Sequence, residues 1–176
     1  QTIRKMGEQT TLDVGVRGIN TELVKLLGRL KYRFSYGENV LQPSIEVARL
    51  AGMMAGEIGA NVKVATAGGL LHDIGKAMDH EMEGGHPAIG MEFAKRFGET
   101  REEVLNAIGG HHGDIPSTSP YTPIVMAADA VSGARPGARR ESMELYIQRL
   151  KQLEDIAYDS GSVREAYAIQ AGREVR

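Results

Sequence analysis

The chain contains no cysteine, and aromatic residues make up only 5% of its 176 positions. The absence of cysteine excludes disulfide bonds, thiolate metal sites and cysteine nucleophiles, so any metal must be bound through nitrogen and oxygen. No apolar run approaches the roughly 20 residues of a membrane span, and the N-terminus has no signal-peptide pattern. A net charge of −2 gives no global attraction to nucleic acid, which would therefore need a local patch. We expect a soluble, cytoplasmic chain.

Strand-like patterns are also scarce, because most segments place apolar residues at helical spacing. We therefore predict an all-α fold, and the length fits one domain over residues 1–176 without repeats. Asn20 or Thr21 should cap the second helix, and Thr100 should cap the sixth in a capping box with Glu103. Pro43 lacks a backbone N–H, so the third helix should begin near it or kink there. The expected helices cover roughly residues 4–12, 22–33, 42–58, 62–73, 88–97, 101–110, 124–131 (helix or strand), 141–156 and 162–171.

The segment Leu70–Lys76 places His72 beside Asp73, a neutral nitrogen ligand next to an anionic oxygen ligand. The apolar residues before this pair have helical character, so both side chains would extend from a packed and rigid element, as a metal site requires. A His-Asp pair also occurs by chance. A helix that ends in a polar turn, with Gly75 as its cap, is the alternative.

Further metal-ligand types are expected at the ends of the predicted helices. Asp129 lies within an apolar segment, where a carboxylate needs a partner; that partner could be a metal, or Arg135 or Arg139, or the N-terminus of a short helix. The histidine doublet could be a polar turn that complements a helix dipole. Taken together, the two aspartates and four histidines predict one convergent metal site, formed by His72, Asp73, His86, His111, His112 and Asp129.

Nitrogen and carboxylate ligands without thiolate suit manganese, iron, zinc, cobalt or, less well, magnesium, bound as one or two ions. Such ions polarise a phosphoryl oxygen and lower the pKa of bound water toward neutrality, which provides a hydroxide nucleophile. Asp73 is the natural bridge between two ions. Basic residues could hold the substrate phosphate, although ordinary surface charge also explains them; these are Lys76, Arg135, Arg139 and Arg140.

A second basic pattern lies on the helix expected over residues 22–33. Lys25, Arg29 and Arg33 recur every four residues on one face, and three rings follow: Tyr32, Phe34 and Tyr36. This face could follow a phosphate backbone while the rings stack on bases. A solvated basic face is the alternative.

The order of His72-Asp73, His86, His111-His112 and Asp129 resembles that of the HD superfamily of metal-dependent phosphohydrolases. Several stretches resemble more narrowly the HD domain of the ribonuclease Y family: 26–33, 35–42, 111–114, 127–130, 134–141 and 169–174. The stretch 134–141 is much more specific than a His-Asp pair. The resemblance covers nearly the whole chain.

This resemblance implies an HD-domain helical bundle that acts as a hydrolase. The activity would be that of an endonuclease that cleaves phosphodiester bonds of single-stranded RNA and initiates mRNA decay. His72, Asp73 and Asp129 would bind a first metal, and His86, His111 and His112 a second. Catalysis would rest on His72, Asp73 and Lys76.

The resemblance also implies that the chain is a fragment of a longer bacterial protein. In that family a membrane segment, a coiled coil and a KH domain precede the HD domain, and a short C-terminal region follows it. The fragment would bind RNA, form a homodimer and make no membrane contact, whereas the full-length protein would be anchored at the cytoplasmic face of the cell membrane.

One position departs from the family pattern, because Pro43 stands where the family has its first metal-ligating histidine. Losing a ligand should weaken metal binding at least as much as losing an outer-shell partner, which costs roughly 10–100-fold. Two alternatives to the ribonuclease therefore stay open. One is an HD-type hydrolase of a nucleotide or cyclic dinucleotide, and the other is a metal-deficient module for RNA binding or dimerisation.

Overall fold

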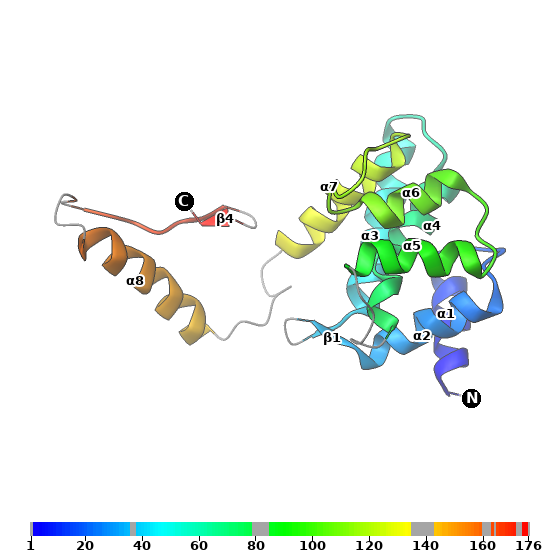
Figure 1. Cartoon of the computed structure of the whole chain (residues 1–176), viewed down its shortest axis with the longest axis horizontal. Helices are drawn as coiled ribbons and strands as arrows, with labels where there is room; N and C mark the ends of the chain where they lie inside the picture. Colours follow the sequence, from blue (N-terminus) through cyan, green and yellow to red (C-terminus); the bar gives the residue numbers. More distant parts are fainter. Residues whose placement is uncertain are drawn as a thin grey trace.

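The computed structural model describes residues 2–35, 38–78, 85–134, 143–159, 163, 165–171 and 174–175, and helices dominate them (Figure 1). The elements in chain order are α1 (Thr2–Val14), α2 (Thr21–Arg29), η1 (Leu30–Tyr32), β1 (Phe34–Ser35), β2 (Glu38–Asn39), α3 (Leu41–Glu57), α4 (Val62–Leu71), η2 (Ile74–Ala77), α5 (His86–Arg96), α6 (Glu102–Gly110), α7 (Tyr121–Ala134), α8 (Met143–Asp159), β3 (Gln170–Ala171) and β4 (Glu174–Val175). The strands form two small antiparallel hairpins, β1 with β2 and β3 with β4. The predicted all-α class is confirmed.

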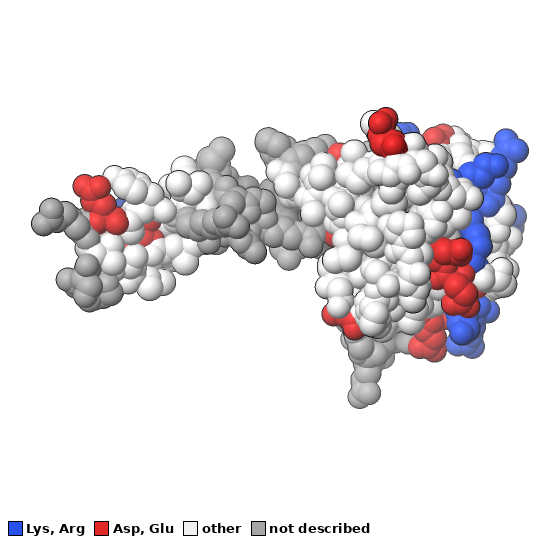
Figure 2. Space-filling model, turned by 90° about the horizontal axis from the view of Figure 1, so that it is seen from above, with Lys and Arg blue, Asp and Glu red and all other residues white. Residues whose placement is uncertain are grey.

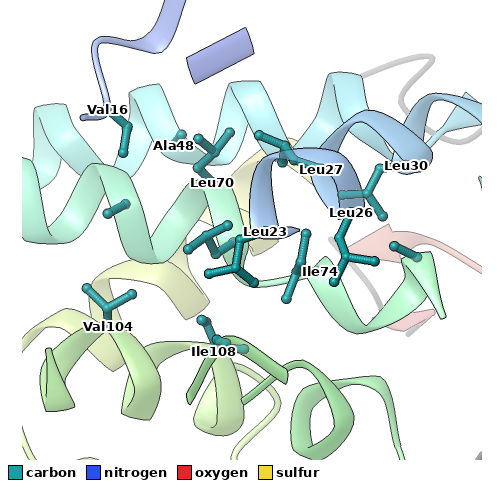
Figure 3. Packing of buried hydrophobic residues seen from close by; sticks show 14 of the residues in the cluster. Val16, Leu23, Leu26, Leu27, Leu30, Ala48, Leu70, Ile74, Val104 and Ile108 are labelled. Carbon is teal, nitrogen blue, oxygen red and sulfur yellow. The ribbon is translucent and has the colours of Figure 1, made fainter. Parts of the chain in front are cut away.

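Helix α4 lies at the centre of a bundle formed by α1–α7 and contacts α3, α6 and α7. Its second half is buried on every side, as expected of a helix that is apolar all round. The larger apolar cluster joins α2, α4, η2 and α6 through buried residues that include Leu23, Leu27, Leu70, Ile74 and Ile108 (Figure 3). A second cluster lies between α3 and α7.

Two glycines let the neighbouring helices approach α4 closely. A Cβ added to Gly69 would lie 2.8 Å from the Ala48 Cα and 2.9 Å from the Val47 carbonyl oxygen, both backbone atoms of α3. One added to Gly68 would lie 3.2 Å from the Ala107 Cβ on α6. These glycines would weaken an isolated helix, so their presence reflects tertiary packing.

Helix α8 and the β3–β4 hairpin lie apart from the bundle in Figure 1. Among the described residues, no helix is both long enough and apolar enough to cross a membrane. Figure 2 shows that lysine and arginine side chains gather at the end of the bundle away from α8, the side on which Figure 1 places α1 and α2.

The helix caps show where local patterns succeed and where they fail. Asn20 caps α2 as predicted, because its Oδ1 accepts the Glu22 backbone N–H at 2.8 Å. The predicted capping box at Thr100 is wrong, since α6 begins at Glu102 and Arg101 occupies its N-cap without a side-chain capping bond. The helix predicted over residues 162–171 is also wrong: the described residues 163 and 165–169 are not helical, and β3 follows them.

Candidate metal centre

His72 and Asp73 form the turn between α4 and η2. Both are buried, with exposed fractions of 1% and 6%. The His72 Nδ1 lies 2.7 Å from the Gly69 carbonyl oxygen, which can only accept, so Nδ1 carries the proton. The lone pair of a neutral ring is therefore on Nε2, which lies 3.4 Å from Asp73 Oδ2. The ring is held in the tautomer and orientation that a metal ligand needs.

The His111 ring, just after the end of α6, is held by the same kind of bond as the His72 ring. His111 is 3% exposed, and its Nδ1 donates to the Ile108 carbonyl oxygen at 2.7 Å. The His111 Nε2 is then free to accept or to bind a cation, and it lies 3.8 Å from Asp73 Oδ1. Two buried imidazoles, from α4 and α6, thus direct their Nε2 atoms at the same carboxylate.

His86 opens α5 and completes this group. Its Nε2 lies 3.1 Å from Asp73 Oδ1, 3.2 Å from His111 Nε2 and 3.1 Å from His112 Nε2. A single N–H cannot serve three acceptors in different directions. Two ligands bound tetrahedrally to one ion at 2.0–2.1 Å would be roughly 3.3–3.4 Å apart, close to the separations among these nitrogens. The spacing suits a shared cation better than hydrogen bonds between the rings.

Two groups of ligand atoms could each hold a metal. One is formed by His72, Asp73 and His111, and the other by His86, His111 and His112. The Oδ2 of Asp73 faces His72, whereas its Oδ1 faces His86 and His111. Oδ1 is buried and accepts no hydrogen bond, although the His86 nitrogen is near. An unsatisfied buried carboxylate oxygen is costly, and a bound cation would remove that cost. The residues therefore fit a divalent metal, which Asp73 would help to hold.

The electrostatics of the centre also favour a cation. Burial lowers the pKa of His72, but the carboxylates of Asp73 and Asp129 outweigh it, so the pKa is raised. Burial raises the pKa of Asp73, but the charge of His72 and other positive groups hold it well below its usual range. Burial, with the nearby charge of His72, lowers the pKa of His111 to about 3. Asp73 is thus ionised and His111 neutral at pH 7, the forms that bind metals.

Asp129 reaches the centre from α7, the element that the sequence left as a helix or a strand. Its Oδ1 lies 3.9 Å from His72 Nε2. The structure therefore brings all six predicted metal ligands together. Their role as ligands stays a prediction.

The predicted phosphate-binding residues are placed only in part. Lys76 Nζ lies 2.7 Å from Asp73 Oδ2, so this lysine compensates the buried carboxylate directly. Its side chain is still 29% exposed. Arg135, Arg139 and Arg140 lie outside the described residues.

The position of Pro43 follows from the packing of α3 on α4. A Cβ on Gly52 would meet Thr66 Oγ1, and Gly69 packs on Ala48, so the two helices run antiparallel. Continuing this register by one turn places the first turn of α3 opposite the end of α4, beside residues 72–73. Pro43 is in that first turn, where a backbone N–H is not needed, so α3 begins at Leu41 and requires no kink.

A hydrogen bond between α3 and α7 supports the same placement. Ser132 Oγ donates to Glu46 Oε2 at 2.7 Å. Glu46 is one turn beyond Pro43, so the face of α3 that carries position 43 is turned toward the C-terminal part of α7. Helix α7 runs antiparallel to α3, because Tyr121 at its start contacts Asn61 at the start of α4 and Asp129 lies near His72 at the end of α4.

Asn106 organises this region and was missed from the sequence. It is 8% exposed, its Nδ2 donates to the Pro116 carbonyl oxygen, and its Oδ1 accepts from the Thr118 backbone N–H and the Thr122 hydroxyl. These bonds connect α6, which ends at His111, to the following loop and to the first turn of α7. The available signal was an amide within the apolar segment of α6, which had to find buried partners.

Comparison with known proteins places these observations in a family. The model of the HD domain matches residues 40–134, which include Pro43 and all six predicted ligands. The ribonuclease Y of Acetivibrio thermocellus is 57% identical over 175 residues, 99% of this chain and 33% of that protein. Those of Clostridium kluyveri and Bacillus pumilus are 59% and 58% identical over 174 residues, 99% of this chain and 34% and 33% of theirs. The chain thus spans about one third of the length of these curated relatives. No solved structure matches it significantly.

Proposed function

This chain belongs to the HD domain family, and from that premise we propose that it is the metal-dependent catalytic domain of an endoribonuclease. The reaction is hydrolysis of phosphodiester bonds in single-stranded RNA, as a first step of mRNA decay. The observation that carries the proposal is the convergence of His72, His86 and His111 on the two oxygens of Asp73, one of which is buried without a hydrogen bond. The similarity to proteins named ribonuclease Y supports RNA as the substrate.

The ligand set would serve one or two ions. His72, Asp73 and Asp129 would hold one, and His86, His111 and His112 would hold a second. The nitrogen and oxygen donors suit manganese, iron, zinc or magnesium. A bound divalent ion supplies a Lewis acid for a phosphoryl oxygen and lowers the pKa of water at the site.

The chain's own residues bind and orient the substrate. Lys76 provides a positive charge at the edge of the centre, where its partly exposed ammonium group can contact a phosphate while remaining near Asp73. Arg135, Arg139 and Arg140 are proposed to hold further phosphates. The full-length protein, which is longer than this chain in the relatives, is proposed to be a homodimer anchored at the cytoplasmic face of the membrane.

Pro43 favours one second candidate. Without a ligand from α3, the domain could bind RNA or dimerise without a competent metal centre. Hydrolysis of a nucleotide or cyclic dinucleotide is not favoured, because the similar proteins are named ribonucleases.

The test is the double variant His72→Ala with Asp73→Ala, compared with Asp13→Ala, which removes an exposed carboxylate from α1. Metal content is measured by elemental analysis, and cleavage is measured on a labelled single-stranded RNA with manganese. We expect the double variant to lose both metal and cleavage while its circular dichroism stays helical, and Asp13→Ala to retain both.

Unchanged turnover in the double variant would remove the metal mechanism. A wild-type chain that is folded, contains no metal after incubation with manganese and does not cleave RNA would instead support the metal-deficient module.

A further inference from the structure

A groove of about 550 Å³ lies between α1, α2 and α5, and none of the six proposed metal ligands lines it. Its volume is within the range of roughly 300–1,000 Å³ that is usual for small-ligand sites. The floor is apolar and aromatic, formed by Leu26 from α2, Met78 beyond η2, and Phe93 and Phe97 from α5. The two rings are only partly buried, with centroids 5.7 Å apart and planes inclined by 49°. They offer a surface on which a planar group could stack.

The rim of the groove is positively charged. Arg4, Lys25 and Arg29 line it, opposed by the single carboxylate of Glu22. Lys25 pairs with Glu22 and Arg4 pairs with Glu8, but these partners are three and four residues apart on exposed helix surfaces. Such exposed pairs contribute little and exchange readily with another anion. The groove therefore combines rings with cations, the combination that binds single-stranded nucleic acid.

The groove adjoins the metal centre along the chain. Met78 follows Lys76 by two residues, and two residues span at most roughly 7 Å. The Lys76 ammonium is itself bonded to Asp73. A strand bound at Asp73 would therefore need to extend only a short way past Lys76 to bring its next nucleotide to the groove.

A second groove at the other end of α4 shows what is particular to the first. It has a volume of about 410 Å³ and is lined by Arg17, Lys63 and Arg101, but by no aromatic side chain. Arg101 is also engaged by Glu99 through two side-chain bonds. That groove offers charge without a surface for a base.

We propose that the groove between α1, α2 and α5 binds a nucleotide of the single-stranded RNA next to the scissile phosphodiester, with its base on Phe93 and Phe97 and its phosphate at Arg29 and Lys25. This inference rests on the proposed function, because it takes RNA as the substrate. The inference also changes one expectation from the sequence, which placed the cations of α2 next to the rings of Tyr32, Phe34 and Tyr36. Lys25 and Arg29 of α2 do line the groove, but its rings come from α5. Tyr32 and Phe34 are exposed and do not line it, and Tyr36 lies outside the described residues.

The test measures RNA binding without catalysis, on the whole chain in EDTA, by fluorescence anisotropy of a labelled single-stranded oligonucleotide at several salt concentrations. Arg29→Gln should raise Kd about fivefold or more and reduce the slope of log Kd against log salt by about 0.7, because one phosphate contact is lost. Phe93→Leu should raise Kd about fivefold or more while leaving the slope unchanged, because it removes stacking but no charge.

The matched control is Lys95→Gln, which removes one positive charge from the exposed face of α5 and does not line the groove. It should leave both Kd and the slope near wild-type values. Thermal unfolding of each variant verifies that it is folded, and Arg29→Gln changes only an exposed side chain.

Equal effects of Arg29→Gln and Lys95→Gln, or no effect of either groove substitution, would overturn the inference. If the wild-type chain still cleaves RNA with manganese in that case, the proposed function stands and only the groove is excluded. A wild-type chain that neither binds nor cleaves single-stranded RNA would instead overturn the proposed function.

Discussion

Replacing Pro43 with histidine tests the placement of the first turn of α3 beside the metal centre. The helix register sets position 43 opposite residues 72–73, on the side of α3 from which Glu46 reaches Ser132. An imidazole there would add a nitrogen donor near His72. Because even an outer-shell partner changes metal affinity by roughly 10–100-fold, we expect Pro43→His to tighten manganese binding by at least about tenfold. That factor corresponds to about 1.4 kcal/mol.

Without metal, the same substitution should destabilise the fold. Histidine gives the unfolded chain more conformational freedom than proline, which costs about 0.4–1 kcal/mol. The regained backbone N–H lies in the first helical turn and contributes no intrahelical bond. For a domain of this size, each 1 kcal/mol shifts Tm by about 2–4 °C. The variant should therefore unfold about 1–4 °C below wild type in EDTA.

With manganese in large excess, the order should reverse. Ligand binding stabilises the native state by RT ln(1 + [L]/Kd), so a tenfold lower Kd adds about 1.4 kcal/mol at saturation. This gain exceeds the cost in the metal-free protein. The melting curves of variant and wild type should therefore exchange places between EDTA and manganese.

The assays are titration calorimetry with manganese and thermal unfolding followed by circular dichroism. The control is Gln42→His, which adds the same ring at an exposed neighbouring position, about 100° around the helix. Equal gains in affinity for both variants would show nonspecific coordination. Unchanged affinity for Pro43→His would show that position 43 is not at the centre.

Three further substitutions test how the bundle positions the centre. Gly75→Ala should reduce manganese affinity about tenfold or more, measured by calorimetry, because a Cβ there would overlap the carbonyl oxygen of His86 and displace the start of α5. Asn106→Ala should lower the free energy of unfolding in urea by about 2–4 kcal/mol, since three hydrogen bonds are lost and a buried hydroxyl loses its partner; a loss below about 1 kcal/mol would contradict the role of this amide. Glu99→Gln should cost about 1–2 kcal/mol at pH 7. Burial raises the pKa of Glu99, but the hydrogen bonds from Arg101 have the larger combined effect and lower it. The stabilisation by Glu99 is therefore fully present above the ordinary pKa of 4.5 and disappears as the pH falls through the lowered pKa of the folded state. A difference in stability between wild type and Glu99→Gln that did not change with pH would contradict this role.

The sequence predicted the helices of the bundle because their apolar spacing records the packing that forms them. It also selected the six residues that the structure brings together, since histidines and aspartates within apolar segments are rare, and five of the six lie at or beside a helix end. The cap of α6 could not be foreseen in this way, because Thr100 and Glu103 fit the capping-box pattern, whereas the buried Glu99 accepts the Arg101 backbone N–H and binds the Arg101 guanidinium. The groove could not be predicted from the sequence either, because nothing in the spacing of Lys25 and Arg29 indicates that the rings beside them come from α5.

The metal centre depends on these tertiary contacts more than on any single helix. Asp73, His86 and His111 come from three separate elements, and the approach of η2 to α5 requires Gly75 to lie against the backbone of α5. The unfolded chain has no such arrangement, so metal bound here must stabilise the native bundle as a whole. Because the proposed ligands lie at the end of α4, the start of α5 and the end of α6, amide exchange in those three helices should slow together when manganese binds. Protection confined to residues 72–76 would indicate a local site that does not hold the bundle together.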